Sequence, residues 1–162
     1  MCVMTSTVPS TTDNFGVTDE TAITSVVGQF FSAFVSGADA ARHVSVLRTI
    51  LLPDAIVVNA AGSEPVVLTV DSFIEPRVEL LTHGGLVDFR EWMTSARIEL
   101  FGDIAQVWCT YEKSWSGDDG AHHGRGSKAI HLVRTAAGWR ISSVAWDDEP
   151  AEPPTESVGP RS

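Results

Sequence analysis

The sequence predicts an α+β domain in which three N-terminal helices pack on a curved, mostly antiparallel sheet and enclose a cone-shaped pocket. Apolar residues recur at helical spacing in the first half of the chain, whereas the second half alternates apolar and polar residues. Short turns join the alternating segments, which indicates consecutive antiparallel strands. Helices gathered ahead of such a meander are typical of α+β domains, because a doubly wound sheet would interleave strands with helices.

The first helix has the clearest periodicity. Thr18 is a suitable N-cap, and Gly37 is a suitable stop beyond the last periodic residue. The apolar positions form one continuous stripe at helical spacing, made up of Ile23, Val26, Val27, Phe30, Phe31, Phe34 and Val35. We expect this stripe to face the concave side of the sheet.

Two further helices are expected before the long strands. One follows Asp39 and ends at Pro53, and the other runs from about Asp71 to Thr82. Pro76 lies inside the latter, so the pattern predicts either a kink or a later start, because proline lacks the N–H that a helix interior needs.

The strands are expected to be long and joined mostly by tight turns. They cover residues 86–101, 104–115, 127–135 and 139–146, with short strands at 55–60 and 66–69. Tight turns are expected at 101–104 and 136–138, and a longer loop is expected to begin at Gly117, with His122 and His123 inside it.

Strand alternation assigns side chains to the two faces of the sheet. One face of the second long strand carries Ala105, Val107, Cys109 and Tyr111, and we expect it to face the pocket. The other face carries Gln106, Trp108, Thr110 and Glu112. By the same rule, Trp146 should share a face with Val144 and Ser142.

The composition excludes several classes of function. The chain has 162 residues and is 43% hydrophobic, which is enough for a core, and it has a formal net charge of −10. That charge argues against a nucleic-acid partner or an anionic membrane surface. No stretch approaches the roughly 18 apolar residues of a membrane helix. Residues 18–149 are expected to fold, between a disordered leader at 1–17 and a disordered acidic, proline-rich tail at 150–162.

Cysteine usage predicts a cytoplasmic protein. Cys2 lies in the expected leader and Cys109 in an expected strand, so a disulfide between them is not expected. The first residues also lack the basic and apolar regions of a secretory signal.

Two segments resemble a known superfamily. Residues 124–146 contain a strand, a short glycine turn, Trp-Arg-Ile and a final tryptophan, and residues 34–65 resemble the start of steroid isomerases. Together they make residues 18–149 similar to the nuclear transport factor 2-like superfamily, and within it to the SnoaL-like proteins. The resemblance implies the helix-covered cone, but the superfamily includes isomerases, cyclases, epoxide hydrolases, dehydratases and proteins without catalysis.

The resemblance argues against a ketosteroid isomerase. The position of the catalytic base corresponds to Asn59, which cannot accept a proton at neutral pH. The oxyanion donors correspond to Ile130 and to Phe30 or Phe31, none of which has an acidic hydrogen. A different ligand or reaction is therefore expected.

The expected pocket is apolar and aromatic, with Tyr111 and Asn59 as its main polar groups. Its lining is predicted to comprise Phe30, Phe31, Phe34, Asn59, Cys109, Tyr111, Ile130 and Trp146. No cofactor is expected, and no metal either, because the spacing of His122 and His123 beside two aspartates fits no zinc pattern. The acidic run 147–149 either reaches the pocket mouth as an acid or base or is simply solvated.

Three functions remain open from the sequence. The first is a SnoaL-like pocket protein that binds a small hydrophobic or aromatic molecule. The second is an acid–base enzyme on the same scaffold, of the cyclase, dehydratase or epoxide hydrolase type, and the third is a non-catalytic dimeric interaction module. A homodimer is expected in any case, because Trp108 should lie exposed on the uncovered face of the sheet.

Overall fold

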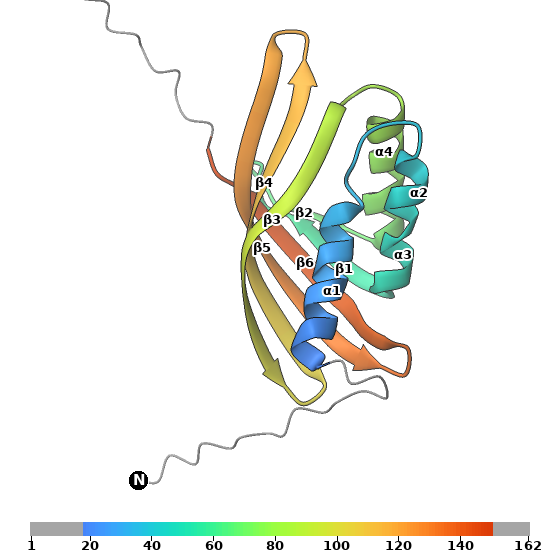
Figure 1. Cartoon of the computed structure of the whole chain (residues 1–162), viewed down its shortest axis with the longest axis vertical. Helices are drawn as coiled ribbons and strands as arrows, with labels where there is room; N and C mark the ends of the chain where they lie inside the picture. The colour runs from blue at the N-terminus through green and yellow to red at the C-terminus, as the bar shows by residue number, and fades with distance from the viewer. Residues whose placement is uncertain (1–17, 151–162) are drawn as a thin grey trace, which may run out of the picture.

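A computed structural model describes residues 18–150, and it confirms the α+β architecture (Figure 1). The expected leader, and the expected tail beyond Pro150, lie outside the described residues. In chain order the elements are α1 (Asp19–Ser32), α2 (Ala40–Ser45), α3 (Leu47–Ile50), β1 (Leu51–Asn59), β2 (Val66–Leu68), α4 (Val70–Thr82), β3 (Val87–Phe101), β4 (Ile104–Gly117), β5 (Gly120–Thr135) and β6 (Gly138–Asp148).

The described strands form a single six-stranded sheet. Its strand order is β2-β1-β6-β5-β4-β3, and every neighbouring pair is antiparallel except β1 and β6. The helices lie on one face of this sheet, and the opposite face carries none of the described helices (Figure 1). In residues 18–150, no helix is both long and apolar enough to cross a membrane.

Helix α1 begins after the expected N-cap but ends at Ser32, so the expected stop at Gly37 is wrong and Phe34 and Val35 lie beyond the helix. Thr18 accepts a hydrogen bond from the backbone N–H of Thr21 at 3.2 Å, which satisfies one of the free N–H groups of the first turn. The apolar stripe packs into the core, with Ile23, Val27 and Phe30 almost fully buried.

The second expected helix is broken and shorter than predicted. Val46 separates α2 from α3, and the chain is already extended at Leu51, two residues before Pro53. Leu51 pairs with Ile141 of β6, so tertiary strand pairing overrides the local helical pattern.

Helix α4 starts at Val70, so the expected later start is wrong. Thr69 and Ser72 form a reciprocal capping box that fixes this end. Pro76 is accommodated inside the helix, and Arg77 uses a guanidinium N–H to bond the carbonyl of Phe73 at 2.9 Å.

Two predictions about the long strands need correction. The loop expected at Gly117 is a tight turn, because Gly117 pairs directly with Gly120 and the histidines therefore lie on β5. Strand β6 has a bulge where Ile141 and Ser143 pair with Leu132 and His131. The bulge reverses the alternation of faces along β6. Trp139 and Ile141 before the bulge and Val144 after it lie on the buried face. Ser142 does not lie on that face, so the expectation that it shares a face with Val144 is wrong.

Candidate functional site

A cavity of about 260 Å³ lies between α4 and the part of the sheet where β3, β4, β5 and β6 meet. It is lined by Phe34, Phe73, Pro76, Arg77, Leu80, Leu81, Leu86, Phe89, Glu91, Tyr111, Lys113, Lys128 and Trp146. The walls are aromatic, as the sequence predicted, but four charged residues also line the cavity, namely Arg77, Glu91, Lys113 and Lys128. The expectation of a pocket with few polar groups is therefore wrong.

The aromatic wall is a contiguous set of rings from α4, β6 and the segment that follows α1. Phe73 of α4 lies 5.9 Å from the ring of Phe34 and 5.8 Å from that of Trp146. The guanidinium of Arg77 sits 3.9 Å above Phe73 and 5.4 Å from Trp146. Burial lowers the pKa of Arg77 to about 10, although the nearby charge of Glu91 acts in the opposite direction. A flat ligand would meet ring faces and edges across this wall.

Strand register brings the polar groups together. Glu91 of β3 pairs with Lys113 of β4, and Lys128 of β5 pairs with Trp146 of β6. Cys109 is the β4 partner of Lys128. Because paired residues point to the same face, each of these side chains is delivered to the helix-covered side of the sheet.

A buried ion pair forms the floor of the cavity. Lys128 Nζ lies 2.9 Å from Glu91 Oε1, and the two side chains are only 5% and 9% exposed. Apart from Lys128, Glu91 Oε1 has no hydrogen-bond partner within residues 18–150. Burial lowers the pKa of Lys128, while the charge of Glu91 raises it. Glu91 therefore retains lone pairs that a ligand proton could use.

The Lys128 ammonium is also surrounded by rings. Its Nζ lies 3.9 Å from the centre of the Tyr111 ring and 5.2 Å from that of Trp146. Phe31 and Phe30 lie behind it, at 5.5 and 5.9 Å. These faces offset part of the lost hydration of the cation.

A second cluster of polar side chains, Tyr111, Lys113 and Asp148, links β4 to the end of β6. The hydroxyl of Tyr111 donates to Asp148 Oδ1 at 2.5 Å, and Lys113 Nζ donates to the two oxygens of the same carboxylate at 2.9 and 2.8 Å. Burial raises the pKa of Tyr111, and the hydrogen bond to Asp148 raises it further. Tyr111 is thus a neutral donor whose hydroxyl is already engaged.

The structure distributes the eight predicted pocket residues unevenly. Three of them line the cavity: Phe34, Tyr111 and Trp146. Phe30, Phe31, Cys109 and Ile130 are buried in the core beside it. Burial raises the pKa of the Cys109 thiol to about 11, so this group stays protonated at neutral pH.

Asn59 lies outside the cavity lining. Its side-chain oxygen accepts the backbone N–H of Ala61 at 2.9 Å, which is the turn-capping role. Asn59 therefore has a local structural role, and its expected place in the pocket lining is wrong.

The charged cavity residues were the main omission from the predicted site. Lys128 occupies an inward position in the series Gly124, Gly126, Lys128, Ile130 and Leu132, so strand alternation alone carried the signal. Glu91 is absent from the predicted lining, and Asp148 belongs to the acidic run 147–149 for which a role at the pocket mouth was one of two alternatives. A charged residue in phase with buried apolar neighbours is the pattern that could have identified Lys128.

The histidine–aspartate group at the hairpin tip forms contacts of its own. His122 Nε2 lies 2.6 Å from Asp119 Oδ1, and the imidazole stacks on Trp115 with 5.3 Å between ring centres. Across residues 18–150, no group of three His, Cys, Asp or Glu side chains converges as a metal site would require.

Known proteins resemble this chain in structure. No protein-family model and no curated protein matches its sequence. A protein from Kribbella flavida has 18% identity and a TM-score of 0.66, over 83% of this chain and 93% of the other. An NTF2-like superfamily protein from Salmonella enterica has 13% identity and a TM-score of 0.65, over 86% and 97%. A candidate dehydratase of the NTF2-like family from Streptomyces avermitilis has 18% identity and a TM-score of 0.64, over 82% and 97%.

The chain therefore has the nuclear transport factor 2-like fold, which is the helix-covered cone with the cystatin-like topology. This confirms the superfamily-level architecture expected from residues 18–149. At these identities the likeness establishes the fold alone, and the reaction has to be argued from the site.

Proposed function

We propose that this protein binds a small aromatic or apolar molecule in the cavity and performs acid–base chemistry on it, as a cofactor-independent enzyme of SnoaL-like type. The buried Lys128–Glu91 pair is the observation that carries the proposal. An ion pair in an apolar cavity costs desolvation free energy that a pair of apolar side chains would avoid. Titratable pairs of this kind concentrate at functional sites.

Glu91 is the group best placed to accept a proton. Its Oε1 is buried beside the cavity, and Lys128 is its one polar partner within the described residues. Lys128, 2.9 Å away, would stabilise negative charge that develops on the ligand when the proton leaves. The pair thus supplies a base and an electrostatic partner at one point of the cavity.

The shape of the cavity favours a compact, flat ligand. About 260 Å³ accommodates one or two rings rather than an extended chain. Phe34, Phe73 and Trp146 offer apolar surface, while the charged pair would recognise one oxygen function. A protein with a formal net charge of −10 disfavours polyanionic ligands such as nucleotides.

The test combines binding with proton transfer. We expect native mass spectrometry and thermal shift to identify aromatic ketones or phenols that bind, and deuterium from D2O to enter the bound compound at an acidic carbon. Glu91→Gln should slow that exchange by about 100-fold, the usual range for removal of a general base. Glu99→Gln is the matched control on the same strand, since Glu99 lies outside this cavity. Equal exchange by both variants, or binding without any exchange, would refute the catalytic proposal.

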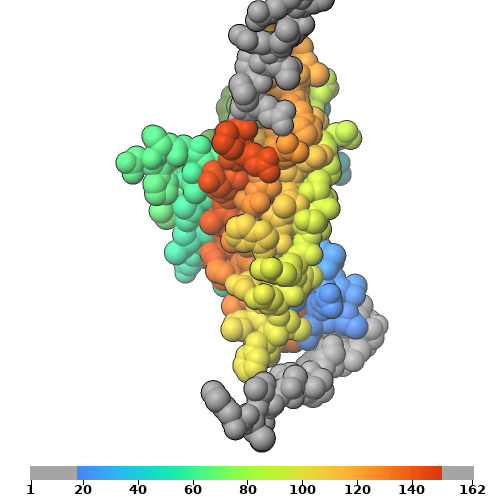
Figure 2. Space-filling model, turned by 90° about the vertical axis from the view of Figure 1, so that its left-hand side faces the viewer, coloured from blue at the N-terminus to red at the C-terminus, as the bar shows by residue number. Residues whose placement is uncertain are grey.

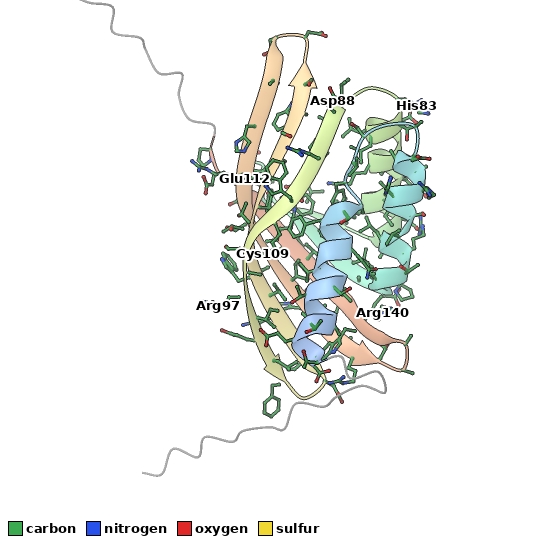
Figure 3. The ribbon with its side chains drawn as sticks, viewed as in Figure 1. His83, Asp88, Arg97, Cys109, Glu112 and Arg140 are labelled. Atoms are coloured by element: carbon green, nitrogen blue, oxygen red, sulfur yellow. The ribbon has the colours of Figure 1, made fainter. Side chains whose placement is uncertain are left out.

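We also propose a homodimer formed through the sheet face opposite the helices. Figure 2 shows this face, across which β3 to β6 lie side by side. Arg97 projects from it, away from the helices (Figure 3). Trp108 is 53% exposed, and a hollow of about 440 Å³ is lined partly by Phe101 and Ile104. Apolar groups of this size favour burial against a second copy.

The proposed compartment is the cytoplasm. Cys109 is a free, buried thiol, which fits a reducing environment. A non-catalytic dimeric module would use the same outer face but would have no need of the charged cavity, so the deuterium exchange distinguishes it from the enzyme.

A further inference from the structure

The two lysines of this chain lie at the same place. Lys113 and Lys128 are the only lysines in the sequence, and both line the cavity, whereas the other nine basic residues are arginines. Arginine keeps its proton and is not a nucleophile in proteins, but a lysine can lose its proton and attack a carbonyl group. The cavity is therefore where the side-chain amines of this protein are gathered.

We propose that Lys128 binds a small aromatic aldehyde or ketone covalently, as a reversible imine, within the cavity. This inference rests on the proposed function, because it names the ligand class and the nucleophile of the same site. It stands on the position of Nζ, its neighbouring carboxylate and the surrounding rings.

Lys128 differs from Lys113 in its surroundings. Both oxygens of Asp148 accept hydrogen bonds from Lys113, whose side chain is 21% exposed. Lys128 is 5% exposed, and its ammonium meets a single carboxylate oxygen, Glu91 Oε1, at 2.9 Å. Its amine is therefore the less hydrated of the two and has fewer charged contacts. Burial and the positive charge of Lys113 both favour the neutral amine of Lys128.

The neighbouring groups can move every proton that the reaction requires. Lys128 first transfers a proton from its ammonium to Glu91, 2.9 Å away. The neutral amine then attacks the carbonyl carbon, a C–N bond forms, and the carbonyl electron pair moves to oxygen. Glu91 gives its proton to that oxygen and takes one from the nitrogen, which leaves a neutral carbinolamine beside a protonated Glu91. Glu91 returns its proton to the hydroxyl group, the C–O bond breaks, and water leaves.

The charge balance of this step suits a buried site. An ammonium beside a carboxylate becomes a protonated imine beside the same carboxylate, so the positive charge stays in place. Glu91 keeps a cationic partner throughout the bound state, and no unpaired charge is buried. The aromatic part of the ligand would lie against Trp146 and Tyr111, whose ring centres are 5.2 and 3.9 Å from Nζ.

Reductive trapping tests the proposal directly. The intact protein is incubated with benzaldehyde and sodium cyanoborohydride, and peptide mass spectrometry then locates the benzyl group. We expect Lys128 to be modified about tenfold faster than Lys113 or the N-terminal amine, because desolvated, activated lysines are the ones that form imines. Benzyl alcohol, which has the same ring without the carbonyl, should compete with the labelling.

Three variants control the result. Lys128→Arg and Lys128→Met should lose the fast adduct, and the methionine variant covers the case in which arginine does not fit. Arg97→Lys, which places an exposed amine on the outer sheet face, should label slowly there and keep the fast adduct at Lys128. Slow labelling at Lys128, or equal labelling of all amines, overturns the imine proposal. If benzyl alcohol and other aromatic compounds still bind in that case, the proposed pocket survives, whereas loss of all aromatic binding overturns both.

Discussion

The hydroxyl of Tyr111 reaches across Gly126 to the carboxylate of Asp148, which lies two strands away. Tyr111 pairs with Gly126 on β5, and Gly126 pairs with Asp148 on β6. A Cβ atom at Gly126 would lie 2.6 Å from the Tyr111 hydroxyl oxygen and 2.3 Å from the carbonyl oxygen of Asp147. Because Gly126 has no side chain, the hydrogen bond between Tyr111 on β4 and Asp148 at the end of β6 can form.

Removing this hydrogen bond should weaken the domain. We expect Tyr111→Phe to lower the free energy of unfolding by roughly 1.5–3 kcal/mol, the usual net value of a hydrogen bond to a charged group. Gly126→Ala should cost more, because its methyl group meets backbone as well as the ring. Urea unfolding measures both variants. The geometry is contradicted if Gly126→Ala is as stable as the wild type.

The buried carboxylate of Asp19 connects the first turn of α1 to the β5–β6 hairpin through hydrogen bonds. Arg134 donates to the two oxygens of Asp19 at 2.6 and 2.7 Å, and the indole N–H of Trp139 donates to one of them at 3.2 Å. The hydrogen bonds from Arg134 lower the pKa of Asp19, although desolvation opposes them. The folded state therefore favours the ionised carboxylate more strongly than the unfolded chain does.

Stability should depend on pH through Asp19. Because its folded pKa is lowered, the stabilisation is fully present above the unfolded value of about 3.9 and is lost as pH falls through the folded value. We expect Asp19→Asn to lower the unfolding free energy at pH 7 by about 2 kcal/mol and to flatten its decline below pH 4. Chemical unfolding at several pH values measures this. Asp71→Asn is the control, because its ion pair with Arg48 is exposed and should contribute little.

The sequence was most informative where one period continued without interruption. The alternation of Ala105, Val107, Cys109 and Tyr111 predicted burial correctly, and so did the first-helix stripe except at its last member, Val35, which is 37% exposed. The prediction was wrong where long-range pairing took over, as at Leu51, where β1 replaces a helix, and at the bulge beside Ser142. Neither feature is encoded in the local period, because each depends on the partner strand.

The charged part of the site was less visible in the sequence. Lys128 and Glu91 are 37 positions apart, and they meet because β4 lies between their strands and the side chains share a face. A single strand shows only that a lysine lies in phase with Ile130 and Leu132. Glu91, the partner that offsets the free-energy cost of burying this charge, can be identified only from the sheet register.

Trp146 should contribute binding energy to an aromatic ligand. Its ring lines the cavity next to Phe73 and beneath the guanidinium of Arg77. We expect Trp146→Ala to weaken the binding of aromatic ligands by about 1–3 kcal/mol through lost ring contact. Isothermal titration calorimetry with a hit from the thermal-shift screen measures the change. Trp92→Ala serves as a control, since Trp92 is outside the cavity lining, and equal losses in both variants would show that the pocket is misplaced.

The outer sheet face should determine the oligomeric state. Trp108 is 53% exposed at the centre of β4, and burying it in a second copy would remove apolar surface from water. We expect light scattering at micromolar concentration to give twice the 17.4 kDa mass of one chain, and Trp108→Glu to give the monomer. Val67→Glu is the matched control, because Val67 is 68% exposed on β2, the edge strand farthest from β3.

Salt should strengthen this dimer. Each chain has a formal net charge of −10, so two copies repel each other when they associate. Raising the ionic strength to about 0.5 M shortens the screening length well below the 8 Å of physiological salt and reduces that repulsion, while it leaves the apolar contact in place. The dimer dissociation constant of the wild type should therefore fall as salt is added. A wild-type mass of 17.4 kDa under all of these conditions would exclude the dimer, and a dimer that persists in Trp108→Glu would place the interface elsewhere.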